Sequence, residues 1–322
     1  MDKHVFLCET ESEYESLVYE TPHVALTEDD DVVHYDEASE NKEYKYLDIL
    51  WNDGKVTAEI REPEGDLAPV AICVIPTDYL GRKEKARFMS LLYVDKTGKG
   101  SASEVSMNWG PDSPSENDPL ANMYTMLMCK NVTNPSIDIT ESFVWNNSSI
   151  SNTCPNLRYN EEGTAWKNAK QYLSDPEKKY IVGDIYGKNN TKRIWETLDF
   201  AGNTNYAFVN LKNFNPYNLD LEWYIPAGGE LANMMFNTGY DKYTANGNKF
   251  PEGSLCNIMG KISAKYPGKS ASRISDGDDH WSSSPIDTTD AACFCSGNTN
   301  VCVGNFYDRT TGGASVLAFV QL

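Results

Sequence analysis

The sequence lacks any long apolar run. No stretch of 18 consecutive apolar residues occurs among its 322 positions, whereas a membrane-spanning helix needs about 20. The first residues, MDKHVFLCETESEYES, also lack the apolar core and small-residue cleavage site of a secretory signal. We therefore expect synthesis in a cytosol and no insertion into a membrane.

Basic residues are scarce. The chain has 28 Lys and Arg against 47 Asp and Glu, a formal net charge of −19. A nucleic-acid partner requires basic surfaces that replace the counterions of phosphates, so the balance argues against nucleic acid and against an anionic membrane. The imbalance is local, because residues 1–66 hold 20 acidic and five basic residues. This marks the N-terminal segment as a separate region.

Histidine is rarer still, which limits the possible enzymatic chemistry. Three of the four histidines lie in the acidic N-terminal segment, which leaves His280 as the candidate base in the body of the chain. Asp278, Asp279 and serines 282–284 adjoin it, but neighbours along one strand rarely converge as a triad, and no Gly-x-Ser-x-Gly turn is present. Glycine motifs for phosphates and dinucleotides are missing too. We expect no enzyme, with a hydrolase using His280 as the alternative.

The sequence gives little support for a metal site or for disulfide bonds. Eight cysteines without an export signal are more typical of free buried thiols. Cys293 and Cys295 would point to one face of a strand with Cys302 nearby, but no histidine follows to complete a zinc site. The run Asp276-Gly-Asp-Asp279 is half of a calcium loop without its distal glutamate and is more typical of a turn. The sequence predicts no metal and no cofactor.

The range 44–110 predicts a small β-rich domain. Asn52–Lys55 is an Asp-Gly turn between the apolar runs 46–51 and 56–60, which predicts a hairpin. The continuous apolar run 69–76 fits a strand buried on both faces, and 86–94 fits another strand. Gly, Pro and Ser gather between 97 and 120 and predict a loop or hinge, which places a domain boundary near residue 110.

The remainder predicts mixed structure. Apolar spacing favours helices over 164–173, 191–198 and 228–236, and alternation favours a terminal strand over 314–320. In the acidic N-terminal segment, the two short apolar pieces within 23–35 predict a hairpin or a strand pair. The fold class predicted from these elements is α+β.

Three motifs in the C-terminal half resemble a known family. They begin at Trp166 in a Trp-x-x-Ala helix, at Trp223 in Trp-Tyr-Ile-Pro226-Ala-Gly-Gly-Glu230-Leu, and at Trp281 in Trp-Ser282-Ser283-Ser. In this order they resemble the C-terminal domain of Legionella collagen-like proteins, over about half of the chain. The resemblance implies a C-type-lectin-like fold over 111–322.

The resemblance also implies scaffold roles for the motif residues rather than ligand contacts. Glu230 would lie in the first turn of a helix, where its charge favours the helix dipole. Trp281 would fill the core, with Ser282 and Ser283 bonding the turn that starts the last hairpins. The chain departs from the family at Leu317, where the last strand usually carries an arginine; this puts any role of that arginine in doubt.

A second resemblance covers the N-terminal half. The segment 22–35 resembles one in proteins of gut Bacteroides and their phages, and the runs 71–77 and 86–91 are similar to the β region of crAss-like phage virion proteins. Together these imply a virion protein that is made in the host cytoplasm and exposed on the particle surface.

We therefore expect a non-enzymatic structural protein of a head fibre or tail appendage. Residues 1–43 would attach it to other virion proteins or pair protomers as a homo-oligomer, 44–110 would be a spacer, and 111–322 would meet a host-surface glycan or protein. Tyr and Asn suit such contacts, and the candidates are Asn298, Asn300, Asn305, Tyr307, Asp308 and Arg309. Turn chemistry is the other interpretation of these residues. A purely structural capsid decoration protein and a bacterial surface adhesin remain alternatives.

Overall fold

The computed structural model of the chain describes residues 43–79, 82–83, 85–113, 120, 129–131, 180–182, 187–285, 288–295 and 303–322. The hairpin predicted within 23–35 and the helix predicted over 164–173 lie outside the described residues. So does the attachment segment 1–43, apart from its last residue.

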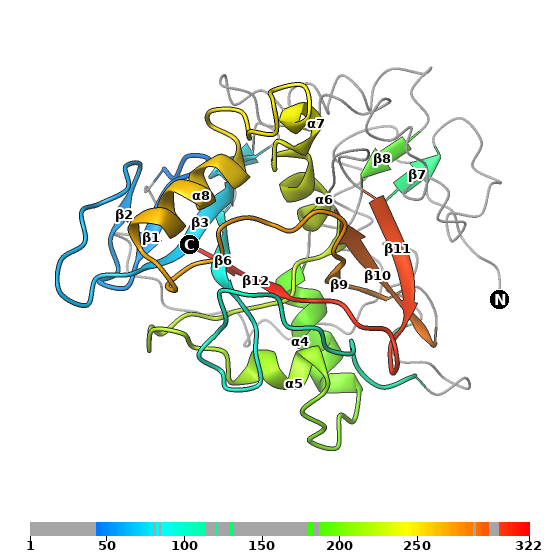
Figure 1. Cartoon of the computed structure of the whole chain (residues 1–322). Coiled ribbons are helices and arrows are strands. Elements are labelled where there is room, and N and C mark those ends of the chain that lie inside the picture. Colours follow the sequence, from blue (N-terminus) through cyan, green and yellow to red (C-terminus); the bar gives the residue numbers. More distant parts are fainter. Residues whose placement is uncertain are drawn as a thin grey trace.

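Five strands form the main sheet, in the order β12-β6-β3-β1-β2, with every neighbouring pair antiparallel (Figure 1). Their bounds are β1 (Ile49–Trp51), β2 (Val56–Thr57), β3 (Pro69–Ile75), β6 (Arg87–Tyr93) and β12 (Leu317–Gln321). The pairing of β1 with β2 confirms the predicted hairpin, and β3 and β6 confirm the strands predicted at 69–76 and 86–94.

The last strand completes this sheet at the edge of β6. Leu317 lies opposite Tyr93, and Phe319 lies opposite Met89. The strand predicted over 314–320 is confirmed with a later start, because Ala314 forms only an isolated bridge with Met107. Residues 44–110 therefore do not form the whole main sheet. Its fifth strand, β12, comes from the C-terminal end of the 111–322 range.

Both faces of the main sheet are buried. In β3, Ile72 and Val74 pack into one apolar cluster, while Ala71 and Cys73 pack into another. Burial on both sides explains why this strand is a continuous apolar run rather than an alternating one.

Helices cover the two faces (Figure 1). Apolar residues of α6 (Gly228–Phe236), α7 (Tyr240–Tyr243) and α8 (Leu255–Lys265) join the first cluster, and those of α4 (Gly187–Thr197) and α5 (Ala207–Lys212) join the second. The helices predicted at 191–198 and 228–236 are confirmed as α4 and α6, with α4 beginning at Gly187. None of the described helices combines the length and apolarity needed to cross a bilayer.

A second antiparallel sheet has the order β11-β10-β9. It consists of β9 (His280–Pro285), β10 (Asp290–Cys295) and β11 (Val303–Asp308). Its side chains divide between the same two clusters, with Phe294 in the first and Trp281 in the second. Two short pairs also occur, β4 (Asp78–Tyr79) with β5 (Arg82–Lys83) and β7 (Cys129–Asn131) with β8 (Tyr180–Val182). The described chain is thus mixed α+β with antiparallel sheets.

The described segment after β6, residues 94–113, is a loop, as its composition predicts, but it is not a free hinge. Met107 and Trp109 are buried in the second cluster. Met107 exchanges backbone hydrogen bonds with Ala314, and the Asn108 N–H donates to the Asn205 carbonyl at 2.9 Å. Two large apolar side chains among the small residues are enough to tie this segment to the core.

Candidate functional site

A buried ion pair anchors the start of α6. Glu230 is 0% exposed, Arg87 of β6 is 4% exposed, and Arg87 Nε donates to Glu230 Oε1 at 3.0 Å. The Tyr224 hydroxyl donates to the same oxygen at 3.0 Å, and the Ala227 N–H donates to Oε2 at 2.9 Å. The carboxylate thus has three donors near a helix N-terminus, where the dipole favours negative charge.

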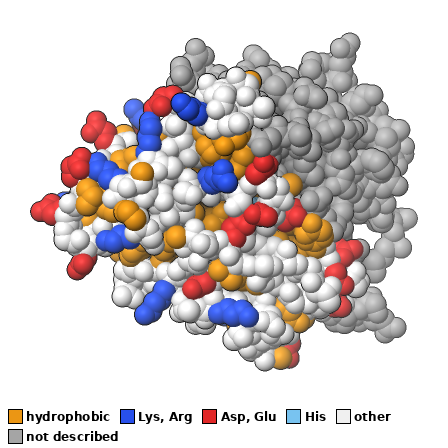
Figure 2. Space-filling model, in the orientation of Figure 1, with side chains coloured by type: hydrophobic (Ala, Val, Ile, Leu, Met, Phe, Trp, Pro, Cys, Tyr) orange, Lys and Arg blue, Asp and Glu red, His pale blue; other side chains and the backbone are white. Residues whose placement is uncertain are grey.

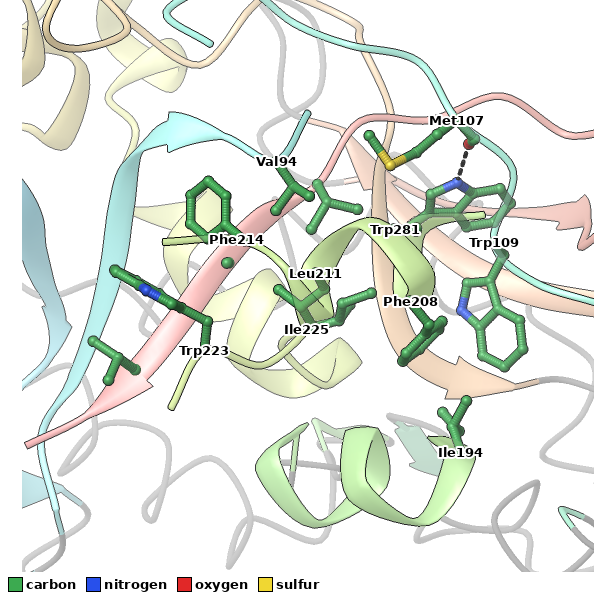
Figure 3. Close-up of a cluster of buried hydrophobic side chains, with 14 of the residues drawn as sticks. Val94, Met107, Trp109, Ile194, Phe208, Leu211, Phe214, Trp223, Ile225 and Trp281 are labelled. Carbon is green, nitrogen blue, oxygen red and sulfur yellow. Dashed lines mark hydrogen bonds between the residues drawn. The ribbon is translucent and has the colours of Figure 1, made fainter. Parts of the chain in front are cut away.

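Two tryptophans link β9 to the segment after β6. Trp281 Nε1 donates to the Met107 carbonyl at 2.7 Å (Figure 3), and Trp109 Nε1 donates to the Ser282 carbonyl at 2.7 Å. Both indoles are fully buried. Because each satisfies its one polar atom across the junction, the two segments are held in a single register.

The motif serines are buried as well. The Ser282 hydroxyl donates to the Ala292 carbonyl at 2.8 Å, the Ser283 N–H donates to the Pro226 carbonyl at 2.8 Å, and the Ser284 hydroxyl accepts from the Gly228 N–H at 3.0 Å. These bonds join β9 to β10 and to the start of α6.

Two further motif tryptophans are Trp223 and Trp166. Trp223 is buried and meets Phe214 edge to face, with ring centroids 5.3 Å apart. Trp166 lies outside the described residues.

Arg309 is buried, so its prediction as a surface contact is wrong. Its guanidinium lies over the Trp109 ring, 4.7 Å from the centroid, and is fully buried. Nη1 donates to the Ser113 hydroxyl at 2.8 Å, and Nε donates to the Asp290 carbonyl at 3.2 Å. An arginine in a turn-rich stretch suggests exposure, but stacking on an indole and two bonds to buried oxygens hold this one inside.

Of the other predicted contact residues, Asn305, Tyr307 and Asp308 belong to β11, and Asn298 and Asn300 precede it in the sequence. Asn298 and Asn300 lie outside the described residues, and the register places Asn305 opposite Cys293. Asp308 is exposed, and its Oδ1 accepts from the N–H groups of Thr310 and Thr311 at 2.8 Å each. The Thr310 hydroxyl and these amides lower the pKa of Asp308. The turn-chemistry interpretation therefore describes Asp308 well.

An acidic cluster surrounds the entry to β9. It comprises Glu104, Asp276, Asp278 and Asp279. Asp276 and Asp278 are exposed, while Glu104 and Asp279 are half-buried. The Tyr307 hydroxyl donates to Asp279 Oδ2 at 2.6 Å, and this bond raises the pKa of the tyrosine. Figure 2 shows acidic side chains near the middle of this face, where Figure 1 places the segment between α8 and β9.

His280 lies beneath this cluster and does not reach solvent. It is fully buried, its ring stacks on Tyr93 with centroids 5.9 Å apart, and Nδ1 lies 3.3 Å from the Phe294 carbonyl oxygen. Burial lowers its pKa to about 4. The ring is therefore neutral near pH 7, and its neighbours Ser282 and Ser284 are bonded elsewhere in the scaffold.

Within the described ranges, no three or more His, Cys, Asp or Glu side chains are placed to hold an ion. Cys293 and Cys295 are free thiols, as are Cys73 and Cys256, while Cys302 lies outside the described residues.

Several residues of these networks were not singled out from the sequence, among them Arg87, Tyr93, Glu104 and Trp109. A signal exists for Arg87, because it is the one charged residue in the mostly apolar run 86–94, and a buried charge requires a partner. Trp109 gives a weaker signal as a large apolar residue in a glycine- and serine-rich stretch. Glu104 gives none, since only the fold brings it beside residues 275–280.

Comparisons with known proteins give little further guidance. No protein-family model matches the chain, and no curated protein matches it. Among solved structures, it is similar to a crystal structure of a fimbrial protein from Bacteroides ovatus ATCC 8483, with a TM-score of 0.42 and 12% sequence identity. The alignment covers 87% of this chain and 49% of that one, so the chain spans about half the length of that protein. A likeness at this level carries no functional argument.

Proposed function

We propose that this chain is a non-enzymatic structural protein on the surface of a crAss-like phage virion, where a lectin-like C-terminal region attaches to a host glycan or protein. The virion origin is supported by the sequence resemblances of both halves. The lectin-like region is supported by the motif residues Trp223, Glu230 and Trp281, which lie in a mixed α+β framework.

The observation that carries the proposal is that the described motif residues, such as Trp223, Glu230 and Trp281, are buried in the framework. The Arg87–Glu230 pair fixes β6 to the start of α6, and the Trp281–Met107 bond fixes β9 to the segment after β6. A framework held by such internal bonds can support variable edge loops without changing its core. Such loops are where recognition residues concentrate.

The environment of His280 favours binding over catalysis. A general base must reach the proton it removes and should titrate near the working pH. His280 is fully buried, and burial lowers its pKa to about 4. Measured hydrolysis of an ester or glycoside by the purified chain, lost in His280→Phe, would revive the hydrolase alternative.

Labelling of purified particles tests the location. Antibodies raised against the whole chain are applied to phage particles and, separately, to uninfected Bacteroides cells, and bound antibody is seen by gold electron microscopy. We expect gold on the particle surface only. Gold confined to the uninfected cell envelope would replace the proposal with the bacterial adhesin alternative. Gold on neither surface would also refute it.

A further inference from the structure

The turn after α7 contains the dipeptide Asn246-Gly247. It is the one place in the sequence where a glycine directly follows an asparagine. The side-chain amide of an asparagine is open to attack by the backbone nitrogen of the next residue, and the side chain of that next residue is the main steric obstacle. Because glycine has no side chain, this dipeptide is the position in the chain where such an attack is least hindered.

The structure leaves both reacting groups accessible to water. Residues 244–249 are all exposed. Among the described residues, no heavy atom lies within 4 Å of a Cβ placed on Gly247. The backbone of Gly247 can therefore move toward the Asn246 side chain without meeting a neighbouring element.

The two ends of this turn are held by aromatic contacts. The rings of Tyr243 and Phe250 have centroids 4.6 Å apart, and Phe250 meets the buried Tyr240 edge to face at 5.0 Å. Tyr243 and Phe250 also pack against the first apolar cluster. The turn between them can therefore rearrange locally without unfolding the core.

Backbone hydrogen bonds give the turn its present form. The Gly247 N–H donates to the Thr244 carbonyl at 3.2 Å, and the Asn248 N–H donates to the Tyr243 carbonyl at 3.0 Å. With Gly247 at a φ of +66°, this is a pattern that commonly ends helices. Since the turn is exposed, water competes for these groups, and transient opening frees the Gly247 nitrogen.

We propose that Asn246 is a site of spontaneous deamidation. The Gly247 nitrogen attacks Cγ of Asn246 and loses its proton to solvent. The new C–N bond closes a succinimide ring, and the Cγ–Nδ2 bond breaks with release of ammonia. Water then opens the ring at either carbonyl, giving aspartate or isoaspartate, in which the main chain passes through the former side chain. The net reaction consumes one water, releases one ammonia and creates a carboxyl group that is ionised at neutral pH.

The product cannot keep the present turn. Asn246 Nδ2 donates to the Lys249 carbonyl at 3.1 Å, and a carboxylate in its place can only accept hydrogen bonds. Isoaspartate also adds a methylene to the main chain, so the N–H groups of Gly247 and Asn248 lose their alignment with their acceptors. Deamidation therefore loosens the turn while Tyr243 and Phe250 stay packed. This inference does not depend on the attachment role.

Peptide mapping of aged protein tests the site. The full chain is kept at pH 8, below its melting temperature, and a sample unfolded in guanidinium chloride sets the time scale. We expect Asn246 to convert before any other asparagine of the described ranges, including the exposed Asn248, whose next residue carries a side chain. Earlier conversion of another described asparagine would overturn the proposal. So would an intact Asn246 in the folded chain once the unfolded sample has converted.

Two variants test the chemistry of the attack. Gly247→Ala places a methyl group beside the attacking nitrogen and should slow conversion. Because alanine is strained at this positive φ, Asn246→Gln is the second variant: it keeps the amide but requires a larger ring, which closes more slowly. Asn189→Gln, at an exposed position of α4, is the matched control and should leave the rate at position 246 unchanged. An unaltered rate at position 246 in both Gly247→Ala and Asn246→Gln would contradict the mechanism.

Amide hydrogen exchange tests the loosening of the turn. The converted chain is separated by anion exchange, because it carries an additional negative charge. Peptides covering 243–250 should exchange faster in the converted chain than in the original, while peptides of β3 exchange equally. Equal exchange over 243–250 in the two forms would overturn this consequence.

Discussion

Arg87 and Glu230 lie 143 positions apart in the chain, yet Arg87 Nε is bonded to Glu230 Oε1 at 3.0 Å with both side chains buried. The pair joins the main sheet to α6, and Tyr224 completes the carboxylate's shell. Burying two charges is costly, but removing one partner leaves the other unpaired in a medium that solvates it poorly.

Glu230→Gln should therefore destabilise the fold by about 3–5 kcal/mol, because it removes the negative charge that Arg87 Nε contacts inside the fold. Urea unfolding followed by far-UV circular dichroism measures this. Glu252→Gln is the matched control, since Glu252 pairs with Lys261 on the surface and exposed pairs contribute about 0–1 kcal/mol. If the two substitutions lowered the free energy of unfolding equally, the buried pair would stabilise the fold no more than an exposed pair does.

Trp281→Phe should cost about 1–3 kcal/mol, because it puts a smaller ring in the core and removes one of the two donors of the Met107 carbonyl, which then accepts only from the Ala314 N–H. Trp281→Ala should cost more, about 3–5 kcal/mol, because it also opens a cavity. Thermal unfolding of both variants separates the two contributions. A Phe variant as stable as the original would mean that packing alone accounts for this residue.

Replacing Gly187 and Gly260 with alanine should change the stability of the protein in opposite directions. A Cβ at Gly187 would lie 2.5 Å from the Ala227 backbone nitrogen and would also meet the Glu230 carboxylate, so Gly187→Ala should lower the melting temperature. A Cβ at Gly260, inside α8, would lie 3.6 Å from the Ser272 carbonyl, which is ordinary contact. Gly260→Ala should stabilise the helix by about 0.5–1 kcal/mol. Calorimetry of both variants checks the prediction, and shifts of the same sign would contradict it.

His280 should make the protein less stable in acid. Burial lowers its pKa to about 4 from 6.5, so the unfolded chain binds the proton more readily between these values. Its contribution to stability is complete above about pH 6.5 and declines as the pH falls toward 4, by at most about 3 kcal/mol. Urea unfolding at pH 7 and 4.5 measures the decline. In His280→Phe the decline should be smaller by that amount, and an identical decline would contradict the assignment.

The local pattern of apolar residues is enough to predict elements whose burial follows a simple rule along the chain. The run at 69–76 predicts a strand because both of its sides are buried, and the glycines at 228–229 followed by Leu231, Met234 and Met235 predict α6. The helix α8 was missed although Leu255, Cys256, Met259 and Ile262 follow helical spacing and are buried. Gly260 and the turn-rich surroundings conceal that pattern in the sequence.

Long-range pairing could not be predicted in this way. Nothing near Leu317 indicates that it lies opposite Tyr93, so the sequence suggests a self-contained β region where the structure shares a sheet with the last residues. The same holds for Arg309, whose exposure was inferred from its neighbours but whose burial depends on Trp109, 200 positions earlier. Glu104 likewise lies 3.7 Å from His280 Nε2 only because the fold brings the two residues together.

The most direct test of the attachment claim is binding of the fluorescently labelled full chain to intact Bacteroides cells, measured by flow cytometry. We predict saturable binding. The double substitution Asn298→Ala and Asn300→Ala should weaken it about tenfold, while Asn215→Ala, at an exposed position in the framework, leaves it unchanged. Absence of saturable binding, or equal binding by both variants, would contradict the account.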